Sequence, residues 1–167
     1  MSATYFRNDF QDLVNFDSVR FRLVNRSEAR VQGGEFRAEY AANADLAFGV
    51  NLSYLSWGLV DTTQPLRNIP HANGGVQVDW RPAARLRTRF ETQWIGRRYD
   101  FAVSAPGIGT VGGYSNTNVS ADYSVSRRVG LYVRADNLFD AYFHEYIGFP
   151  NPGASVRLGV RFHAFAN

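Results

Sequence analysis

Cysteine and lysine are both missing from this chain of 167 residues. Without cysteine, the chain can form neither a disulfide framework nor a thiolate metal site, and it carries no signal of its redox compartment. Arginine supplies all 18 basic residues, and 15 acidic residues reduce the net charge to +3. Because charges of both signs are interspersed, we expect no basic surface of the kind that binds nucleic acids, and no nucleic-acid partner.

Long apolar runs are missing as well. No segment approaches the roughly 20 apolar residues of a transmembrane helix. The N-terminal stretch MSATYFRNDF has neither the basic start nor the apolar core of a signal peptide. These features are expected of a chain that is cytoplasmic, already processed, or cut from a longer protein.

What the sequence does contain is a repeated alternation of apolar and polar residues. In residues 85–96 the even positions carry apolar residues and threonine, while the odd positions carry Arg85, Arg87, Arg89, Glu91 and Gln93. The same alternation recurs in residues 46–54, 76–80 and 156–163. A period of two is typical of β-strands with one apolar face, so the pattern predicts an all-β, antiparallel fold.

Eight strands are predicted, and their connections alternate in length. Tight turns are expected at residues 41–43, 81–83 and 126–127, and long loops at residues 58–71, 99–112 and 140–152. This arrangement is typical of transmembrane β-barrels, which have short periplasmic turns and long extracellular loops. The predicted strands are residues 4–15, 20–41, 44–57, 72–81, 84–98, 113–125, 128–139 and 153–165.

The two faces of these strands suggest lipid on one side and a lumen on the other. Trp57, Trp80 and Trp94 fall at strand ends, where aromatic girdles lie at the membrane interfaces. On the lumen face, Arg85, Arg87, Arg89 and Glu91 form a polar stripe. The stripe either guides anionic ligands or pairs with neighbouring carboxylates, and we favour pairing.

Two strands depart from simple alternation. In the second strand the apolar positions change phase near Gly33 and Gly34, which predicts a β-bulge that restores the facing. In the first strand, the even residues are expected to face outward, although this places an amide among the rings: Thr4, Phe6, Asn8 and Phe10.

Several segments resemble the C-terminal third of TonB-dependent outer-membrane receptors, and together they span nearly the whole chain. The most specific is Asn137-Leu138-Phe139-Asp140, followed by Tyr142, Gly148 and Pro152-Gly153. The resemblance is closest to the group of vitamin B12 and siderophore receptors. The segments are YFRNDFQDLVNF (5–16), LVNRSEARVQGGEFRAEY (23–40), PLRNIPH (65–71), WIGRRYD (94–100) and ADNLFDAYFHEYIGFPNPGASVRLGVRF (135–162).

The resemblance implies uptake of a siderophore-like or cobalamin-like substrate across the outer membrane of a Gram-negative cell, without enzymatic activity or a cofactor. Family members have a plug domain, a segment that contacts TonB, and a barrel of about 22 strands. Nothing in residues 1–167 resembles the plug. We therefore expect a single β-barrel domain or the C-terminal segment of a larger barrel, which would contact TonB only through a plug absent from this sequence.

Because substrate contacts in this family come from extracellular loops and the plug, the resemblance also implies candidate ligand contacts. These are Arg97, Arg98, Tyr99, His144 and Tyr146. The rings of the last loop, residues 140–152, are expected at the bilayer interface and the barrel mouth. Phe165 resembles the terminal aromatic residue that the outer-membrane insertion machinery recognises.

Two other interpretations stay open. One is a self-contained eight-stranded barrel with a structural, adhesive or passive pore role, and the other is a soluble β-barrel binder. Metal and catalytic sites find little support in the sequence. His71, His144 and His163 lack the spacing of metal ligands, and Ser104 and Ser155 lie in no catalytic motif.

Overall fold

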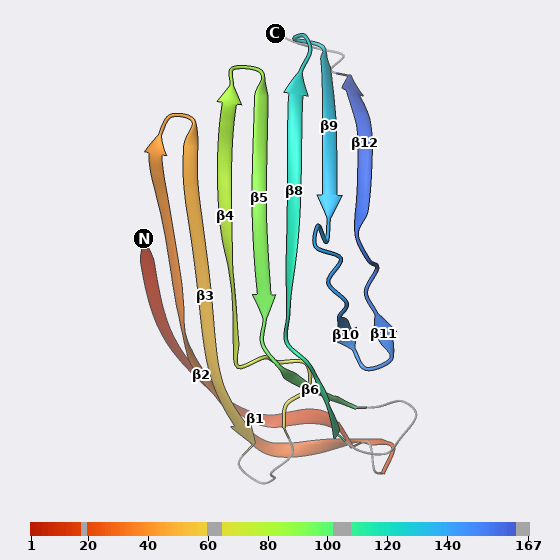
Figure 1. The fold of residues 1–167 in the computed structure, drawn as a ribbon. Coiled ribbons are helices and arrows are strands. Elements are labelled where there is room, and N and C mark those ends of the chain that lie inside the picture. Colours follow the sequence, from red (N-terminus) through yellow and green to blue (C-terminus); the bar gives the residue numbers. More distant parts are fainter. Residues whose placement is uncertain (18–19, 60–64, 102–107, 163–167) are drawn as a thin grey trace.

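The computed structural model is one open antiparallel sheet with two small hairpins (Figure 1). It describes residues 1–17, 20–59, 65–101 and 108–162. Within these ranges, no helix is long and apolar enough to cross a membrane. The eight strands of the sheet are β1 (Ser2–Asp17), β2 (Arg22–Asn43), β3 (Leu46–Leu59), β4 (Ala72–Ala83), β5 (Leu86–Ile95), β8 (Tyr114–Ser124), β9 (Val129–Asp136) and β12 (Ser155–Phe162).

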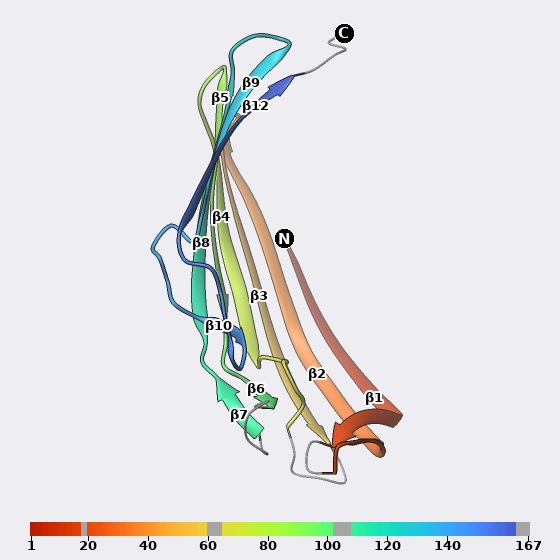
Figure 2. The same ribbon diagram turned by 90° about the vertical axis from the view of Figure 1, so that its right-hand side faces the viewer.

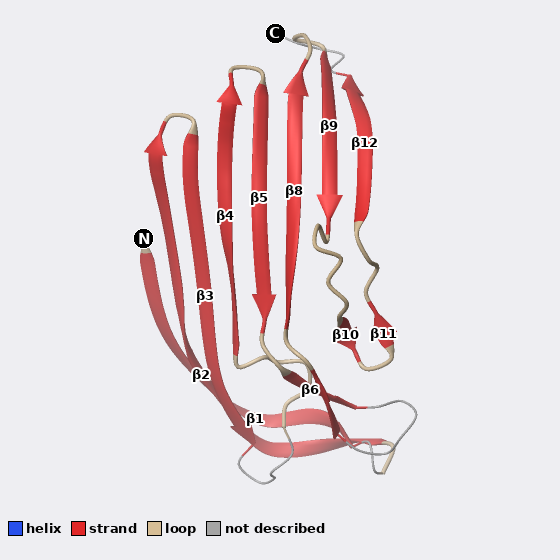
Figure 3. Ribbon diagram, viewed as in Figure 1, coloured by secondary structure: helices blue, strands red, loops and turns tan. Residues whose placement is uncertain are grey.

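The strands are paired in the order in which they occur in the chain, with β1 at one edge and β12 at the other. All eight predicted strands are confirmed, with boundaries that differ by a few residues. The tight turns lie together at the top of Figure 3, and the long connections lie at the bottom. Seen from the side, the sheet is twisted and curved (Figure 2).

The two hairpins lie inside long connections, and the sequence did not predict them. β6 (Arg98–Phe101) pairs with β7 (Ile108–Val111), and β10 (His144–Tyr146) pairs with β11 (Phe149–Pro150). These strands have two to four residues each. Strands this short do not establish a period of two, so alternation could not reveal them.

The register gives the sheet two chemically different faces, because side chains directly opposite each other on neighbouring strands share a face. The apolar face is defined by a row of successive partners from β2 to β8: Tyr40, Phe48, Val78, Phe90 and Val119. The polar face is defined by the adjacent row: Glu39, Gly49, Gln77, Glu91 and Asn118.

Two tryptophans bound the apolar face. Trp80 lies opposite Thr88 near the tight turns, and Trp94 lies opposite Gly74 near the long connections. Along β5, the distance from Thr88 to Trp94 is roughly 20 Å at about 3.3 Å per residue. An apolar band of about this height between aromatic residues is typical of a barrel wall in an outer membrane.

The predicted bulge at Gly33 and Gly34 is wrong. β2 pairs with β1 and β3 through this region without a register shift. Ala29 and Val31 therefore lie on the polar face, opposite Leu59 and Trp57. The apolar residues change face because a loop segment covers the polar face at this level, where a small core forms from Ala29, Leu59 and Leu66 with Val31, Trp57 and Ile69 packed against it.

The predicted outward face of the first strand is also wrong. Thr4 lies opposite Glu35 on the polar face, whereas Tyr5 lies opposite Gly34 on the apolar face. Aromatic residues occupy both faces of β1, because Tyr5 and Phe6 are adjacent. The positions of the aromatic residues alone therefore predicted the wrong outward face for β1. The pairing of β1 with β2 identifies the correct one.

Replacing Gly33 by alanine is expected to lower the free energy of unfolding by about 1–3 kcal/mol, which is the range for overpacking. A Cβ atom at this position would overlap the carbonyl oxygen of Tyr54, which is backbone and cannot turn aside. At Gly34, a Cβ would meet only the Thr4 carbonyl oxygen, at 3.7 Å. Denaturant titration of the full-length protein in lipid vesicles should therefore separate Gly33→Ala from Gly34→Ala, and equal effects would contradict this packing.

Candidate functional site

Three connections meet at the long-loop end of the sheet, and Asp100 on β6 joins them. Its side chain is 3% exposed and forms an ion pair with Arg67, with Arg67 Nη2 at 2.9 Å from Asp100 Oδ1. The backbone N–H of Ile147 donates to Asp100 Oδ2 at 3.1 Å. One buried carboxylate therefore holds the β3–β4 connection, the β6–β7 hairpin and the last loop together.

Arg98 makes a second link between the β6–β7 hairpin and the last loop. Its guanidinium is buried and donates to the carbonyl oxygens of His144 at 3.0 Å and Glu145 at 2.6 Å. It also lies over the ring of Tyr114, 5.5 Å from the ring centroid. Tyr114 stacks on Phe143 with centroids 3.9 Å apart, so β8 supports the same loop.

Trp57 forms an aromatic cluster at this end of the polar face. Its ring stacks on His71 at 4.7 Å and meets the edge of Tyr99 at 6.2 Å. The backbone N–H of Asn68 donates to the carbonyl oxygen of Tyr99 at 2.8 Å. Because Trp57 lies opposite Val31 on the polar face, it does not join Trp80 and Trp94 on the apolar face.

A groove opens between β7, the start of β8 and the last loop. His144 is half-buried there, and its Nε2 lies 3.0 Å from the hydroxyl of Tyr142. Tyr142 itself is 79% exposed. The side chains and backbone that line the groove include Gly112, Gly113, Tyr142, Phe143, His144 and Ile147.

The five loop candidates from the sequence have different surroundings. Arg98 and Tyr99 contact neighbouring loops through the interactions above, and Arg98 is buried. His144 lines the groove, whereas Arg97 and Tyr146 are exposed. The sequence did not identify Asp100 or Arg67, because a single carboxylate and an arginine more than thirty residues apart carry no local motif.

The Asn137-Leu138-Phe139-Asp140 segment forms the corner where β9 enters the last loop. The side chain of Asn137 accepts from Ala141 N–H and donates to the carbonyl oxygens of Ala141 and Pro152. Asp140 accepts from Ala154 N–H at 2.8 Å. Asn137 and Asp140 both have positive φ, a conformation that asparagine and aspartate tolerate better than most residues.

Replacing Asn137 by alanine is expected to open this corner at a cost of about 1–3 kcal/mol, because buried backbone groups lose their partners. Amide hydrogen exchange of Ala141 should accelerate. Asn151→Ala is the matched control, since in the part of the chain that the structure describes the Asn151 side chain makes only a 3.4 Å contact with Glu145. Unchanged protection of Ala141 in Asn137→Ala would contradict the role of this side chain.

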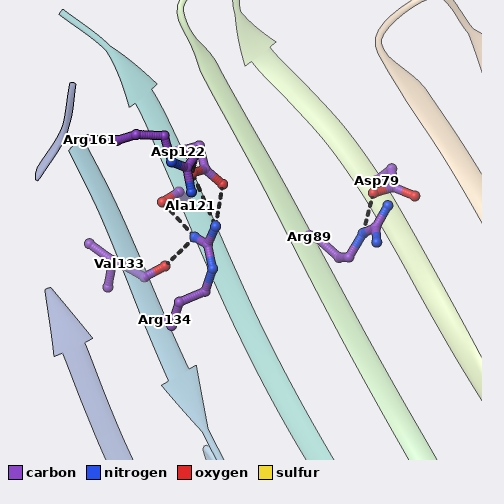
Figure 4. A network of polar contacts seen from close by, with 7 residues as sticks. All are labelled: Asp79, Arg89, Ala121, Asp122, Val133, Arg134 and Arg161. Atoms are coloured by element: carbon purple, nitrogen blue, oxygen red, sulfur yellow. Dashed lines mark hydrogen bonds and ion pairs between the residues drawn. The ribbon is translucent and has the colours of Figure 1, made fainter. Parts of the chain in front are cut away.

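Ion pairs cross the polar face toward the tight-turn end (Figure 4). Arg89 Nε lies 2.6 Å from Asp79 on β4. Asp122 on β8 receives Arg134 at 2.8 Å and Arg161 at 3.6 Å, so it links β8 with β9 and β12.

The predicted polar stripe lies beside this network. Arg89 is paired with a carboxylate, as the pairing hypothesis expects, and Arg85 donates to the carbonyl oxygen of Val125. Arg87 has no hydrogen bond or ion pair within the part of the chain that the structure describes. The stripe is therefore partly paired, and its Arg87 guanidinium is the one without a partner among the described residues.

Among the described residues, no group of three or more histidine or acidic side chains could hold a metal ion. His163, Ser104 and the terminal Phe165 lie outside those residues.

Comparison with known proteins shows which family has this architecture. Residues 1–138 match the family model described as TonB dependent receptor-like, beta-barrel. Three solved receptors superpose on 96% of the chain: the ferric-catecholate import receptor Fiu of E. coli K12 (TM-score 0.77, 16% identity), the ferripyoverdine receptor of the outer membrane of Pseudomonas aeruginosa (0.76, 12%) and the copper transporter OprC (0.79, 20%).

The chain spans only 24% of the first two solved receptors and 28% of the third. The family match covers most of the chain, and the eight-stranded sheet has the order and the two faces of a barrel wall. This chain therefore belongs to the TonB-dependent receptor family, whose members are outer-membrane transport proteins and not enzymes, and it forms part of the β-barrel.

Proposed function

We propose that this chain forms a wall and part of the outer mouth of a receptor that takes up a metal–chelate complex of the siderophore type. The observation that carries the proposal is the groove of Tyr142, Phe143 and His144 at the long-loop end. In outer-membrane barrels the long loops are extracellular, so the groove would face incoming ligands.

The groove has the chemistry to hold a flat, partly aromatic ligand. Aromatic side chains supply large contact areas, and the Tyr142 hydroxyl and His144 imidazole supply polar contacts beside them. Gly112 and Gly113 add no side chains to the opposite wall. Because Asp100 and the other links fix the loop, little ordering is needed when a ligand binds.

The solved receptors favour a metal cargo. They are an import receptor for ferric catecholates, a receptor for ferripyoverdine and a transporter of copper. The sequence resemblance did not separate siderophore from cobalamin receptors, and these structures give the siderophore interpretation the stronger support. Arg97 and Tyr146 would contact the ligand at the rim of the groove.

The edges of the sheet support a larger barrel. β1 and β12 do not pair with each other, and unpaired backbone is not tolerated in lipid. Further strands of the same protein would pair with both edges, and TonB would act through a plug in that protein. Trp80 and Trp94 would mark the two membrane interfaces.

Equilibrium binding and uptake of iron-55 complexes, together with uptake of copper ions, by cells that produce the full-length receptor test the ligand site. With a ferric catecholate and a ferric hydroxamate as probes, Tyr142→Ala combined with His144→Ala should raise the Kd at least about tenfold for the preferred complex. Tyr123→Ala is the control, because this tyrosine is exposed on the apolar face near the tight turns.

Wild-type affinity in the double variant would refute the groove as the ligand site. Uptake of copper ions, without uptake of either iron complex, would instead refute the siderophore assignment.

A further inference from the structure

The apolar face carries a groove of its own near the long-loop end, across β1 to β5. Its walls are aromatic, with Tyr5 72% and Tyr54 62% exposed. The register places most of the lining residues on the apolar face, at and just beyond the row of Trp94. The lining includes Ala3, Tyr5, Gly34, Phe36, Tyr54 and Trp94.

The groove exists because small residues lie between large ones. At Gly34, an added Cβ would find no heavy atom closer than the Thr4 carbonyl oxygen at 3.7 Å. Ala3 lies opposite Phe36, and Ala72 lies opposite Tyr54, so two more small side chains lie beside rings. The resulting space has the apolar lining that favours burial of a hydrocarbon chain.

A charged cluster continues the groove toward the long loops. Arg7 and Asp9 lie two and four residues beyond Tyr5 on the same face, and Arg30 lies opposite Asp9. Asp9 accepts from Arg7 Nε at 3.0 Å and from Arg30 Nε at 2.6 Å. The Tyr5 hydroxyl lies 3.4 Å from Gln32 at the boundary between the apolar and charged parts.

Asp9 orients both guanidinium groups through one nitrogen atom of each. Within the described residues, only the Nε atoms of Arg7 and Arg30 are engaged, so their terminal amino groups are available. Glu28 is the next acidic residue outward on β2. A guanidinium group binds phosphate oxygens through paired N–H donors, and Asp9 balances only one of the two guanidinium charges at this end of the groove.

We propose that this surface binds the phosphorylated lipid A part of lipopolysaccharide. One acyl chain would lie in the groove, and a phosphate would bind Arg7 and Arg30. The order of the two parts fits this lipid, because the charged cluster lies on the long-loop side, which faces the cell exterior in this family. The inference depends on the outer-membrane location and not on the identity of the transported ligand.

Native mass spectrometry of the delipidated full-length protein, titrated with purified bisphosphorylated lipid A, tests the proposal. The wild-type protein should retain at least one lipid A. Gly34→Phe should weaken binding at least about tenfold by filling the groove, and Arg7→Ala combined with Arg30→Ala should do the same by removing the phosphate contacts. Arg37→Gln is the matched control, since Arg37 lies on the polar face of β2.

The alternative outcomes separate the sources of any binding. Lipid A without phosphates should bind equally to the wild-type protein and to the double arginine variant. Binding that is unaffected by both the groove and the arginine variants, or equally reduced in Arg37→Gln, would overturn the proposal. Equal affinity for phosphatidylglycerol would overturn the assignment to lipid A. Heat-dependent gel mobility confirms that each variant is folded before titration.

Discussion

Replacing Phe90 by arginine is expected to reduce the free energy of unfolding in lipid by about 2–4 kcal/mol, the cost of arginine near the middle of a bilayer. Phe90 lies on the apolar face between Val78 and Val119. Its row falls between those of Trp80 and Trp94, two residues along β5 from the first and four from the second. A guanidinium there would lie between two apolar register partners on that face, so it must disturb the surrounding lipid.

The control is Gln93→Arg, three residues along the same strand and on the polar face, where the expected change is within about 0.5 kcal/mol. Both variants are compared by denaturant titration of the full-length protein in phospholipid vesicles. If Gln93→Arg destabilised the protein and Phe90→Arg did not, the lipid and lumen faces would be assigned the wrong way round.

Replacing Asp100 by asparagine is expected to loosen three loops at once. The substitution keeps the size of the side chain but removes its charge and leaves Arg67 without its carboxylate. Loss of one member of a fully buried pair costs about 3–5 kcal/mol, and we expect about 2–3 kcal/mol here because the Arg67 side chain is 40% exposed. Amide exchange should report the change as faster opening of residues 65–72, 98–101 and 144–147.

Glu145→Gln is the matched control for this experiment. Glu145 lies in the same loop and is exposed, and within the described residues its side chain makes only the 3.4 Å contact with Asn151. If exchange in Asp100→Asn became faster only at residues 98–101, Asp100 would not stabilise the three connections together. The extracellular loops would then not be preorganised by this carboxylate.

The sequence predicted the sheet well because a membrane wall imposes alternation directly on the chain. From β3 to β8 the side chains alternate between the apolar face, which lies against lipid, and the polar face. The sequence therefore keeps a period of two there. The pattern failed beyond the membrane, where this constraint ends. Ala29 and Val31 are apolar on the polar face because a loop covers them there, and Trp57 stacks on His71 instead of joining a girdle.

The candidate site was predictable in its location but not in its contacts. Loop position identified His144 and Arg98, and the Asn137 segment marked the corner that begins the last loop. The link between Arg67 and Asp100 depends on how three connections fold back over the sheet. Long-range pairing of this kind leaves no spacing in the sequence, so it became visible only in the structure.

Cysteine labelling in intact cells tests the central claim, which is that the long connections face the cell exterior and the tight turns face the periplasm. The chain contains no cysteine, so a single substitution within it introduces the only thiol in this part of the receptor. Tyr146→Cys lies in the last loop and Ala44→Cys in the β2–β3 turn, and both positions are exposed. With a membrane-impermeant maleimide, we predict that Tyr146→Cys is labelled in intact cells and Ala44→Cys only after the outer membrane is permeabilised. Labelling of Ala44→Cys in intact cells, with Tyr146→Cys protected, would contradict the account.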